Sequence, residues 1–290
     1  MKIVAVSGGK GGTGKSVVAV NLAIPLSKDR RLVLADLDAE APNDHILLGV
    51  NLRNENPVNI MLPFIEYSKC IKCGVCAKVC DTGAILLSPE KLPFLIPRLC
   101  SGCKSCYLAC PAKAILEGKR TIGYIYETPV NIDGVRFTLV TAMLREGEEH
   151  VPPAVLAAKK HALKIPGDLY LIDTSAGSSN TVSSALYGSK LMLAVTEPTP
   201  LGLHDLEMIL DVAEEFGVET WVVMNKAGIG PEHRHEEVVR RRGSKIVARI
   251  PYSRELIESY VHGSPIVLSN PESDVSKIFL NLSKLVEEAI

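Results

Sequence analysis

Residues 7–16 read SGGKGGTGKS and combine the residue types that bind a phosphate chain. Gly9 and the run Gly14-Lys15-Ser16 complete the spacing G-x-x-x-x-G-K-[ST] between a strand-like and a helix-like segment. In such a loop backbone N–H groups wrap the phosphates, the lysine contacts the β- and γ-phosphates, and the hydroxyl ligates Mg²⁺. A glycine-rich turn without a ligand is the alternative, which the complete motif disfavours. The expected nucleotide-binding residues are Gly9, Lys10, Gly11, Gly12, Thr13, Gly14, Lys15 and Ser16.

Three aspartates end predicted strands, the position at which ligands bind in open α/β sheets. Asp36 and Asp38 lie in VLADLDAEAPN, and Asp173 lies in LIDTSAG. Carboxylates at these positions suit Mg²⁺ coordination and the orientation of an attacking water, although Asp36 and Asp38 could instead cap the next turn. Asn225 ends a further strand, so its side-chain amide could read a base edge or serve only as a turn residue.

All eight cysteines of the chain lie between Cys70 and Cys110. They form the spacing C-x₂-C-x₂-C-x₃-C twice. The two runs belong to a repeat, CIKCGVCAKVCDTGAIL and CSGCKSCYLACPAKAIL. Eight cysteines in a chain without a secretion signal argue against disulfides and for metal or redox chemistry. Closely spaced triplets with a fourth cysteine, duplicated, favour two [4Fe–4S] clusters over structural zinc, which is the rival interpretation.

The bulk composition fits a protein with a large aliphatic core. The 290 residues are 47% hydrophobic but only 5% aromatic, and the net charge is −1. No global charge therefore draws the chain to nucleic acid or to an anionic membrane. No apolar run approaches the roughly 20 residues of a membrane span, and the N-terminus lacks the regions of a signal peptide. We expect a cytoplasmic protein.

The fold must bring these motifs together. Short aliphatic runs alternate with helical patterns, which predicts an α/β fold with a mostly parallel sheet and helices on both faces. Strands are expected at 2–6, 31–36, 135–142, 168–173, 190–196, 220–225 and 245–250. Helices are expected at 15–28, 153–164, 178–188, 202–216, 232–242, 253–261 and 273–289.

The segment from about Phe64 to Arg120 breaks this alternation. A self-similar, cysteine-rich unit inside an α/β pattern indicates an inserted domain, and Pro63 and Gly123 lie near its expected joins. The predicted organisation is a P-loop NTPase domain in two parts, residues 1–63 and 121–290, around a small α+β insert at residues 64–120.

The stretch KGGTGKS resembles the deviant Walker A motif of the MinD/ParA/Mrp group of P-loop ATPases, in which the first lysine marks the motif. The similarity continues through DLDAEAPN, LIDTSAG, TEPTPLG and MNK. It implies ATP hydrolysis by a homodimer that sandwiches the nucleotides, with Lys10 reaching the phosphates bound to the other subunit. A cation supplied in this way stabilises phosphoryl-transfer charge as an arginine finger does. The roles implied for the remaining residues are phosphate binding by Lys15, orientation of the hydrolytic water by Asp38, Mg²⁺ binding by Ser16, Asp36 and Asp173, and adenine contact by Asn225.

Two features separate the chain from membrane-binding and DNA-binding members of that group. The C-terminal SKIFLNLSKLVEEAI has an apolar face, but its lysines are balanced by Glu287 and Glu288, which favours a core helix. The run Arg240–Arg242 lies beside EHRHEE and favours a solvated helix end. We therefore expect neither a membrane nor a nucleic-acid partner.

The duplicated cysteine run resembles bacterial-type ferredoxins that hold two [4Fe–4S] clusters, with the fourth cysteine of each run ligating the other cluster. Pro111 follows Cys110 as in that family, whereas Asp81 follows Cys80, a departure that can change the potential of the second cluster. The resemblance implies Cys70, Cys73, Cys76 and Cys110 for cluster one, and Cys80, Cys100, Cys103 and Cys106 for cluster two.

Together these resemblances imply a MinD-type ATPase that carries an inserted ferredoxin domain. APNDHILLGV, between Asp38 and the insert, predicts a short helix of the kind that moves with γ-phosphate state. The leading hypothesis is that ATP state gates electron transfer through two clusters to an unidentified redox protein. The alternatives are a carrier that assembles clusters on acceptor proteins, and a positioning ATPase whose clusters are structural or sensory.

Overall fold

The computed structural model describes residues 1–177 and 180–290. Seven strands occur where the sequence predicts them: β1 (Lys2–Ser7), β2 (Leu32–Asp36), β7 (Val135–Leu144), β8 (Leu169–Asp173), β9 (Leu191–Thr196), β10 (Glu219–Ala227) and β11 (Lys245–Pro251). Every residue of β2, β8 and β9 is buried. Such complete burial is expected for the parallel strands of a sheet that is covered on both faces.

Two long strands, β3 (Glu55–Ile65) and β6 (Ile115–Ile132), extend the sheet at one edge, and neither was predicted from the sequence. The strand order is β11-β10-β9-β1-β8-β2-β7-β6-β3. All neighbours from β11 to β7 are parallel, whereas β7–β6 and β6–β3 are antiparallel. The prediction of a mostly parallel sheet is therefore confirmed.

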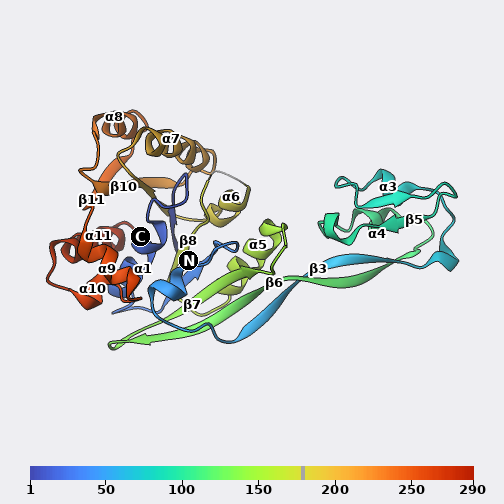
Figure 1. Ribbon diagram of the computed structural model, residues 1–290, viewed down its shortest axis with the longest axis horizontal. Helices are drawn as coiled ribbons and strands as arrows, with labels where there is room; N and C mark the ends of the chain where they lie inside the picture. The colour runs from blue at the N-terminus through green and yellow to red at the C-terminus, as the bar shows by residue number, and fades with distance from the viewer. Residues whose placement is uncertain (178–179) are drawn as a thin grey trace.

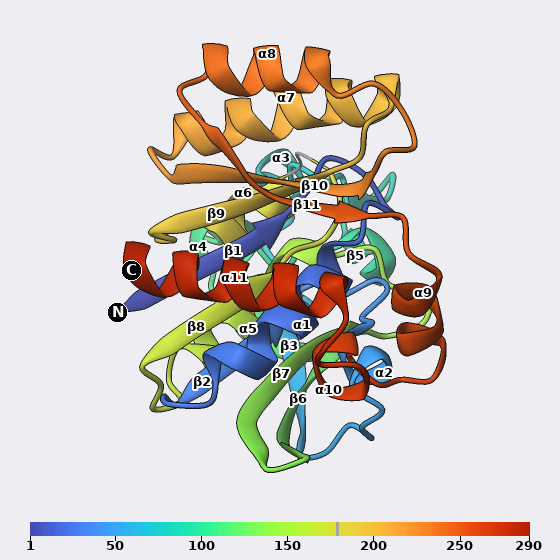
Figure 2. The same ribbon diagram turned by 90° about the vertical axis from the view of Figure 1, so that its left-hand side faces the viewer.

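Helices cover both faces of the sheet, as predicted (Figure 2). Two separate buried apolar clusters, one on each face, hold them to the strands. The first two positions of the predicted helix 178–188 lie outside the described residues. The helices on the two faces are α1 (Lys15–Leu26), α5 (Val151–Ala162), α6 (Asn180–Leu186), α7 (Pro200–Glu215), α8 (His233–Arg241), α9 (Arg254–Val261), α10 (Ile266–Ser269) and α11 (Asp274–Ala289).

The C-terminal helix α11 is a core helix, as its sequence predicts. Phe279, Leu282 and Val286 are buried and belong to the apolar cluster that also contains residues of α1. In Figure 2 the two helices lie on the same face of the sheet. Among the described residues, no helix combines the length and the apolar character that crossing a bilayer requires.

The short helix expected in APNDHILLGV is present as α2 (Asp44–Leu47). It lies between β2, which ends at Asp36, and β3, which begins at Glu55. Its buried first residue, Asp44, faces the carboxyl end of β2, where the backbone N–H of Asp44 donates to the Asp36 carboxylate. The segment after β2 is thereby attached to the strand that carries the predicted nucleotide-site aspartates.

Strands β3 and β6 continue away from the sheet as a two-stranded ribbon that carries the cysteine-rich unit, residues 66–114 (Figure 1). Ile65 pairs with Ile115 at the far end of the ribbon. A small apolar cluster joins the unit to the ribbon and includes Ile85 of the unit and Met61 of β3. The predicted division at residues 64 and 120 falls inside the ribbon strands and stays a prediction. The elements of the unit are α3 (Val75–Lys78), β4 (Ile85–Leu87), β5 (Pro93–Leu95) and α4 (Ser105–Ala109).

Candidate functional site

The phosphate-binding loop connects β1 to α1 at the carboxyl end of the central strands. Gly12 (φ +82°) and Gly14 (φ +93°) adopt the left-handed backbone region that other residues rarely take. A Cβ atom on Gly14 would also lie 2.2 Å from Nδ2 of Asn225. The loop geometry therefore requires glycine at position 14. It leaves Lys15 as the first residue of α1, where the helix N-terminus favours an anion.

Lys15 is buried and is bonded within its own loop. Its Nζ donates to the carbonyl oxygen of Lys10 at 3.0 Å. Burial lowers the pKa of Lys15, and the charges of Asp173 and Asp38 partly offset this effect. The ammonium group therefore lies inside the loop, where the motif places the charge that contacts phosphates.

The second lysine of the loop, Lys10, forms an ion pair that was not predicted from the sequence. Its Nζ lies 2.8 Å from Oε1 of Glu197, while Oε2 of the same carboxylate lies 2.8 Å from Nζ of Lys226. Burial alone would raise the pKa of Glu197, but the two lysines lower it. Lys226 also donates to the carbonyl oxygen of Gly12 at 2.9 Å. The Glu197 carboxylate therefore forms ion pairs with two lysines of the same chain, Lys10 and Lys226.

The structure brings Ser16, Asp36, Asp38 and Asp173 to one place beside this loop. Asp36 lies opposite Asp173 because β2 and β8 are neighbours in the sheet. Ser16 Oγ donates to Asp173 Oδ2 at 2.6 Å. Asp36 is fully buried and accepts backbone N–H groups from Asp38 and from the start of α2. Asp38 is half-buried; burial raises its pKa, and the charge of Lys15 lowers it.

A third buried carboxylate, that of Asp44, also lies at this place and was not predicted. One carboxylate oxygen from each of Asp36, Asp44 and Asp173 lies within 4.8 Å of the others. Both Asp44 oxygens and Asp173 Oδ1 have no hydrogen-bond partner among the described residues. Burial, followed by repulsion between the carboxylates, raises the pKa of Asp36 and Asp44 well above the usual value. In the sequence, Asp44 is indistinguishable from an ordinary first-turn residue of a short helix.

A pocket of about 440 Å³ opens beside the phosphate-binding loop. Asn225 lines it and is buried, and its Nδ2 donates to the carbonyl oxygen of Thr13 at 2.7 Å. This amide therefore supports the loop as well as facing the pocket. Tyr252 and Tyr260, which were not predicted as site residues, add aromatic surface of the kind that nucleotide bases contact. Contact between Asn225 and adenine stays a prediction.

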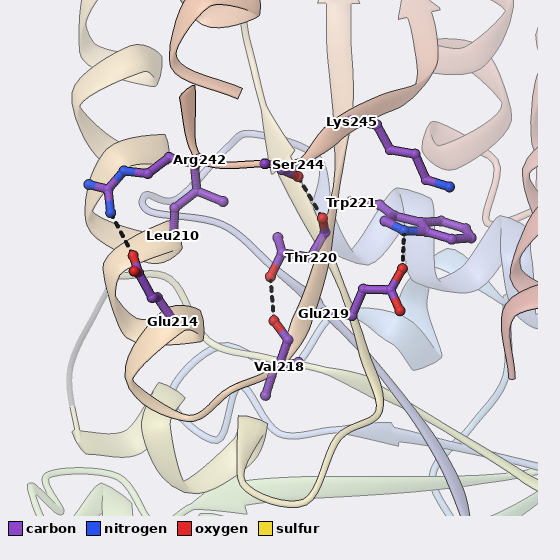
Figure 3. Close-up of a pocket in the computed structure, with 10 residues that line it drawn as sticks. Leu210, Glu214, Val218, Glu219, Thr220, Trp221, Arg242, Ser244 and Lys245 are labelled. Carbon is purple, nitrogen blue, oxygen red and sulfur yellow. Dashed lines mark hydrogen bonds and ion pairs between the residues drawn. The ribbon is translucent and has the colours of Figure 1, made fainter. Parts of the chain in front are cut away.

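A second surface pocket, of about 460 Å³, lies at the other end of the sheet, where β10 and β11 begin (Figure 3). Its charged groups already have partners, either each other or Trp221. Arg242 bonds Glu214, Trp221 Nε1 donates to Glu219 at 2.8 Å, and Lys245 Nζ lies 4.0 Å from the centre of the Trp221 ring. Because these charges already have partners, this pocket is a weaker candidate for a phosphate ligand than the glycine-rich loop.

The eight cysteines form two groups of four, and each group lines one cavity of the cysteine-rich unit. Each cavity takes three cysteines from one run and the fourth cysteine from the other run. These are the two sets that the resemblance to ferredoxins implies. They are Cys70, Cys73, Cys76 and Cys110 in one cavity, and Cys80, Cys100, Cys103 and Cys106 in the other.

The exchange of the fourth cysteine follows from the way the two repeats pack. The backbone N–H of Glu66 donates to Ala114 O at 2.8 Å, and the N–H of Ile96 donates to Ala84 O at 2.7 Å. Glu66 is equivalent to Ile96 in the repeat, and Ala84 is equivalent to Ala114. Each hydrogen bond therefore runs from the earlier position of one repeat to the later position of the other. The beginning of each repeat therefore pairs with the end of the other.

The loops around the two cavities also have the same backbone geometry. At three pairs of equivalent positions both residues have positive φ, although one member of each pair is a lysine. A lysine in the left-handed region is uncommon, so the fold of the unit imposes this loop shape. The pairs are Lys72 and Gly102, Gly74 and Lys104, and Gly83 and Lys113.

Comparison with known proteins shows the family of the domain that contains the phosphate-binding loop. Residues 4–266 match the family described as the CobQ/CobB/MinD/ParA nucleotide binding domain. The chain belongs to this family. The match spans both parts of the sheet and includes every aspartate of the site.

Relatives match most of the chain, and a solved structure shares its fold. An uncharacterized protein of Methanocaldococcus jannaschii is 34% identical over 271 residues, 93% of each chain. An iron-sulfur cluster carrier protein of Aquifex aeolicus is 24% identical over 307 residues, covering 99% of this chain and 68% of that protein. The cell division ATPase MinD of Pyrococcus furiosus shares the fold, with a TM-score of 0.62 and 23% identity over 100% of this chain and 99% of that one.

In this member of the CobQ/CobB/MinD/ParA family, polar contacts join the cysteine-rich unit to the nucleotide-binding body. Arg120 Nη2 donates to the carbonyl oxygen of Cys100 at 3.3 Å, and Nη1 pairs with Glu148 at 2.6 Å. Glu148 lies shortly before α5. Lys159 of α5 donates to two carbonyl groups at the carboxyl end of α6, at 3.0 and 2.8 Å. These contacts extend from one cysteine cavity to the start of α5 and, through Lys159, to α6, which follows β8 in the chain.

Proposed function

We propose that this protein binds and hydrolyses ATP. Lys15 contacts the β- and γ-phosphates, while Ser16, Asp36 and Asp173 hold the Mg²⁺ that accompanies the nucleotide. Asp38 orients the attacking water. The half-buried position of Asp38, close enough to Lys15 for their charges to interact, supports this role. The aromatic pocket beside Asn225 takes the base.

The catalytic unit is a homodimer in which Lys10 acts on the nucleotide of the other subunit. The side chain of Lys10 is 27% exposed, and its ammonium group is directed to Glu197 rather than into its own loop. A cation supplied by a second subunit stabilises the charge that develops during phosphoryl transfer. On this account the ion pair with Glu197 opens when the dimer forms.

The cysteine-rich unit holds two [4Fe–4S] clusters, one in each four-cysteine cavity. The residues fit this group because four sulfur donors from two separate segments converge on each cavity. The backbone N–H of Ala114 donates to Cys110 Sγ at 3.3 Å, a contact that stabilises a ligating thiolate. Bound clusters of this type transfer single electrons. Structural zinc would use the same donors, so metal and sulfide analysis must decide between them.

The observation that carries the functional proposal is the set of contacts from Cys100 through Arg120 and Glu148 to α5 and α6. P-loop proteins have more than one segment that responds to the γ-phosphate, and the segment after Asp173 would be one of them, together with the segment of α2. A change there moves α6, and Lys159 transmits the change to α5. Nucleotide state thereby alters the surroundings of Cys100 and gates electron transfer to a redox partner protein.

A second candidate is a cluster carrier, which the name of the Aquifex relative favours. Against it, the two cavities use all eight cysteines, which leaves no further thiol to receive or hand over a cluster. A positioning ATPase with structural or sensory clusters is the third alternative, and it would need a DNA or membrane surface.

Metal analysis of anaerobically purified protein tests this proposal. We expect about eight iron and eight sulfide per chain. The double variant Cys70→Ser with Cys73→Ser should hold about half of that iron, because both residues line the same cavity. Wild-type protein should also release phosphate from MgATP. Stoichiometric zinc with negligible sulfide would contradict the cluster assignment, and absence of turnover would contradict the ATPase.

A further inference from the structure

We propose that Asp44, with Asp36, Asp173 and Ser16, forms a site that binds a hard divalent cation, Mg²⁺ or Mn²⁺, in the absence of nucleotide. Asp44 is 0% exposed, and its carboxylate meets those of Asp36 and Asp173 within 4.8 Å. The hydroxyl of Ser16 joins the group through Asp173. The inference uses residues of the nucleotide site, but it does not depend on ATP hydrolysis.

Three buried carboxylates this close together require a compensating charge or shared protons. Among the described residues, Asp36, Asp44 and Asp173 form no ion pair with a lysine, arginine or histidine. The charge of Lys15 interacts with that of Asp173, but its ammonium group is bonded to the Lys10 carbonyl and makes no ion pair with the cluster. A bound cation would neutralise the cluster, whereas three carboxylates without one are held together against their mutual repulsion.

Asp44 supplies the free ligand atoms of this group. The carboxylate oxygens of Asp36 accept backbone N–H groups from residues 38, 43 and 44. Asp173 Oδ2 accepts the Ser16 hydroxyl, so its Oδ1 is the oxygen without a partner in the described part of the chain. Both oxygens of Asp44 likewise accept no hydrogen bond there, and without a cation Asp44 lies close enough to Asp173 for the two groups to share a proton. An all-oxygen donor set with several carboxylates suits Mg²⁺ or Mn²⁺ and disfavours metals that prefer thiolates.

The position of Asp44 links this cation site to the ribbon. Asp44 is the first residue of α2, and the chain continues from α2 into β3, one strand of the ribbon. A cation held by Asp44 would fix the start of α2 against the ends of β2 and β8 before nucleotide arrives. Cation binding would thereby fix the segment of the chain that leads into the ribbon.

A Mn²⁺ titration of the nucleotide-free holoprotein tests the proposal directly. Anaerobically purified protein, cleared of nucleotide, is titrated with Mn²⁺, and free Mn²⁺ is measured by room-temperature EPR. We expect one bound Mn²⁺ per wild-type chain, displaced by Mg²⁺. Affinity should fall by at least about 10-fold in Asp44→Asn, because losing a direct ligand should cost no less than losing an outer-shell partner. Glu40→Gln, which removes an exposed carboxylate from the same segment, is the matched control and should bind as wild type does.

Two results would overturn the inference: no competitive Mn²⁺ binding by wild-type protein without nucleotide, or equal binding by Asp44→Asn. A second measurement covers the case in which Asp44→Asn does not fold. Mg²⁺ alone should slow hydrogen exchange at the amides of residues 43–48 in wild-type protein, and unchanged exchange would mean that the carboxylates share protons instead. Because both experiments omit ATP, their failure would leave the ATPase proposal standing, and failure of ATP turnover would leave this site standing.

Discussion

Replacing Glu197 with glutamine tests whether its ion pair with Lys10 restrains dimer formation. The Glu197 carboxylate bridges Lys10 and Lys226, with both N–O distances at 2.8 Å. If Lys10 acts in the site of the other subunit, each protomer must open this contact when the dimer forms. Glutamine preserves the shape of the side chain but removes its charge. Glu197→Gln should therefore destabilise the nucleotide-free protein and strengthen the ATP-bound dimer.

The exposure of the three side chains sets the size of both effects. Glu197 is 9% exposed, whereas Lys10 and Lys226 are 27% and 33% exposed. Such a pair lies between an exposed ion pair, worth about 0.2–1 kcal/mol, and a hydrogen bond to a charged group, worth about 1.5–3 kcal/mol. Taking about 1 kcal/mol per lysine, the free energy of unfolding should fall by about 2 kcal/mol. Two Lys10 contacts open per dimer, so the dimer Kd should tighten about 30-fold.

Sedimentation velocity over a range of protein concentrations, with a non-hydrolysable ATP analogue, measures the dimer Kd. Chemical denaturation measures stability without nucleotide. Glu232→Gln is a matched control, because Glu232 pairs with Arg249 away from the loop and its loss should leave the dimer Kd unchanged. Adding Glu197→Gln to Lys10→Ala should not restore ATP-induced dimerisation. A dimer of Glu197→Gln that is no tighter than wild type would refute the reasoning.

Four further substitutions test the proposed site. Lys15→Ala should abolish ATP binding in calorimetry, because it removes the charge that meets the phosphates. Lys10→Ala should bind ATP as a monomer but lose phosphate release and ATP-induced dimerisation. Asp38→Asn should bind MgATP, hydrolyse it poorly and accumulate as a dimer. Gly14→Ala should weaken ATP binding, because a φ of +93° costs alanine about 1–3 kcal/mol and its Cβ would meet Asn225.

Each of these substitutions has an outcome that would count against the proposal. Tight ATP binding by Lys15→Ala would remove that lysine from the phosphate site. Hydrolysis at the wild-type rate in Lys10→Ala would show that Lys10 does not act on the other subunit. ATP turnover by Asp38→Asn at the wild-type rate would favour the alternative that Asp38 only caps the next turn. Gly217→Ala is the control for Gly14→Ala, since Gly217 also has a left-handed backbone (φ +62°) but lies outside the loop, and equal ATP affinities of the two variants would contradict the loop argument.

The parallel part of the sheet was predictable because its strands are buried on both faces and are therefore continuous aliphatic runs. The ribbon strands β3 and β6 were not predictable in this way. β3 contains Pro57 and Pro63, and β6 contains Gly118 and Gly123, all of which weaken the strand signal. Many of their residues alternate between exposed and buried positions without forming an apolar run. Their pairing depends on contacts between segments that the cysteine-rich unit separates in the chain.

The nucleotide site was predictable where chemistry is local and unpredictable where it depends on distant segments. Lys15, Ser16 and the aspartates that end strands belong to short motifs, and the sheet brings them together. Glu197 lies in the TEPTPLG stretch but had no role assigned to it, and Asp44 belongs to no motif, because their importance comes from meeting Lys10 and the buried carboxylates in space. The grouping of the cysteines came from the resemblance to ferredoxins, since spacing alone does not show which run the fourth cysteine joins.

The central claim, that nucleotide state gates electron transfer, is tested most directly by potentiometric titration followed by EPR. Titrations without nucleotide, with ADP and with a non-hydrolysable ATP analogue would be compared. A coupling free energy of about 1–3 kcal/mol corresponds to a shift of about 40–130 mV for a one-electron couple. We expect such a shift between the ADP and ATP-analogue states, larger at the cluster that includes Cys100, because Arg120 contacts its carbonyl group. Superimposable titrations of both clusters in all three states would contradict the claim.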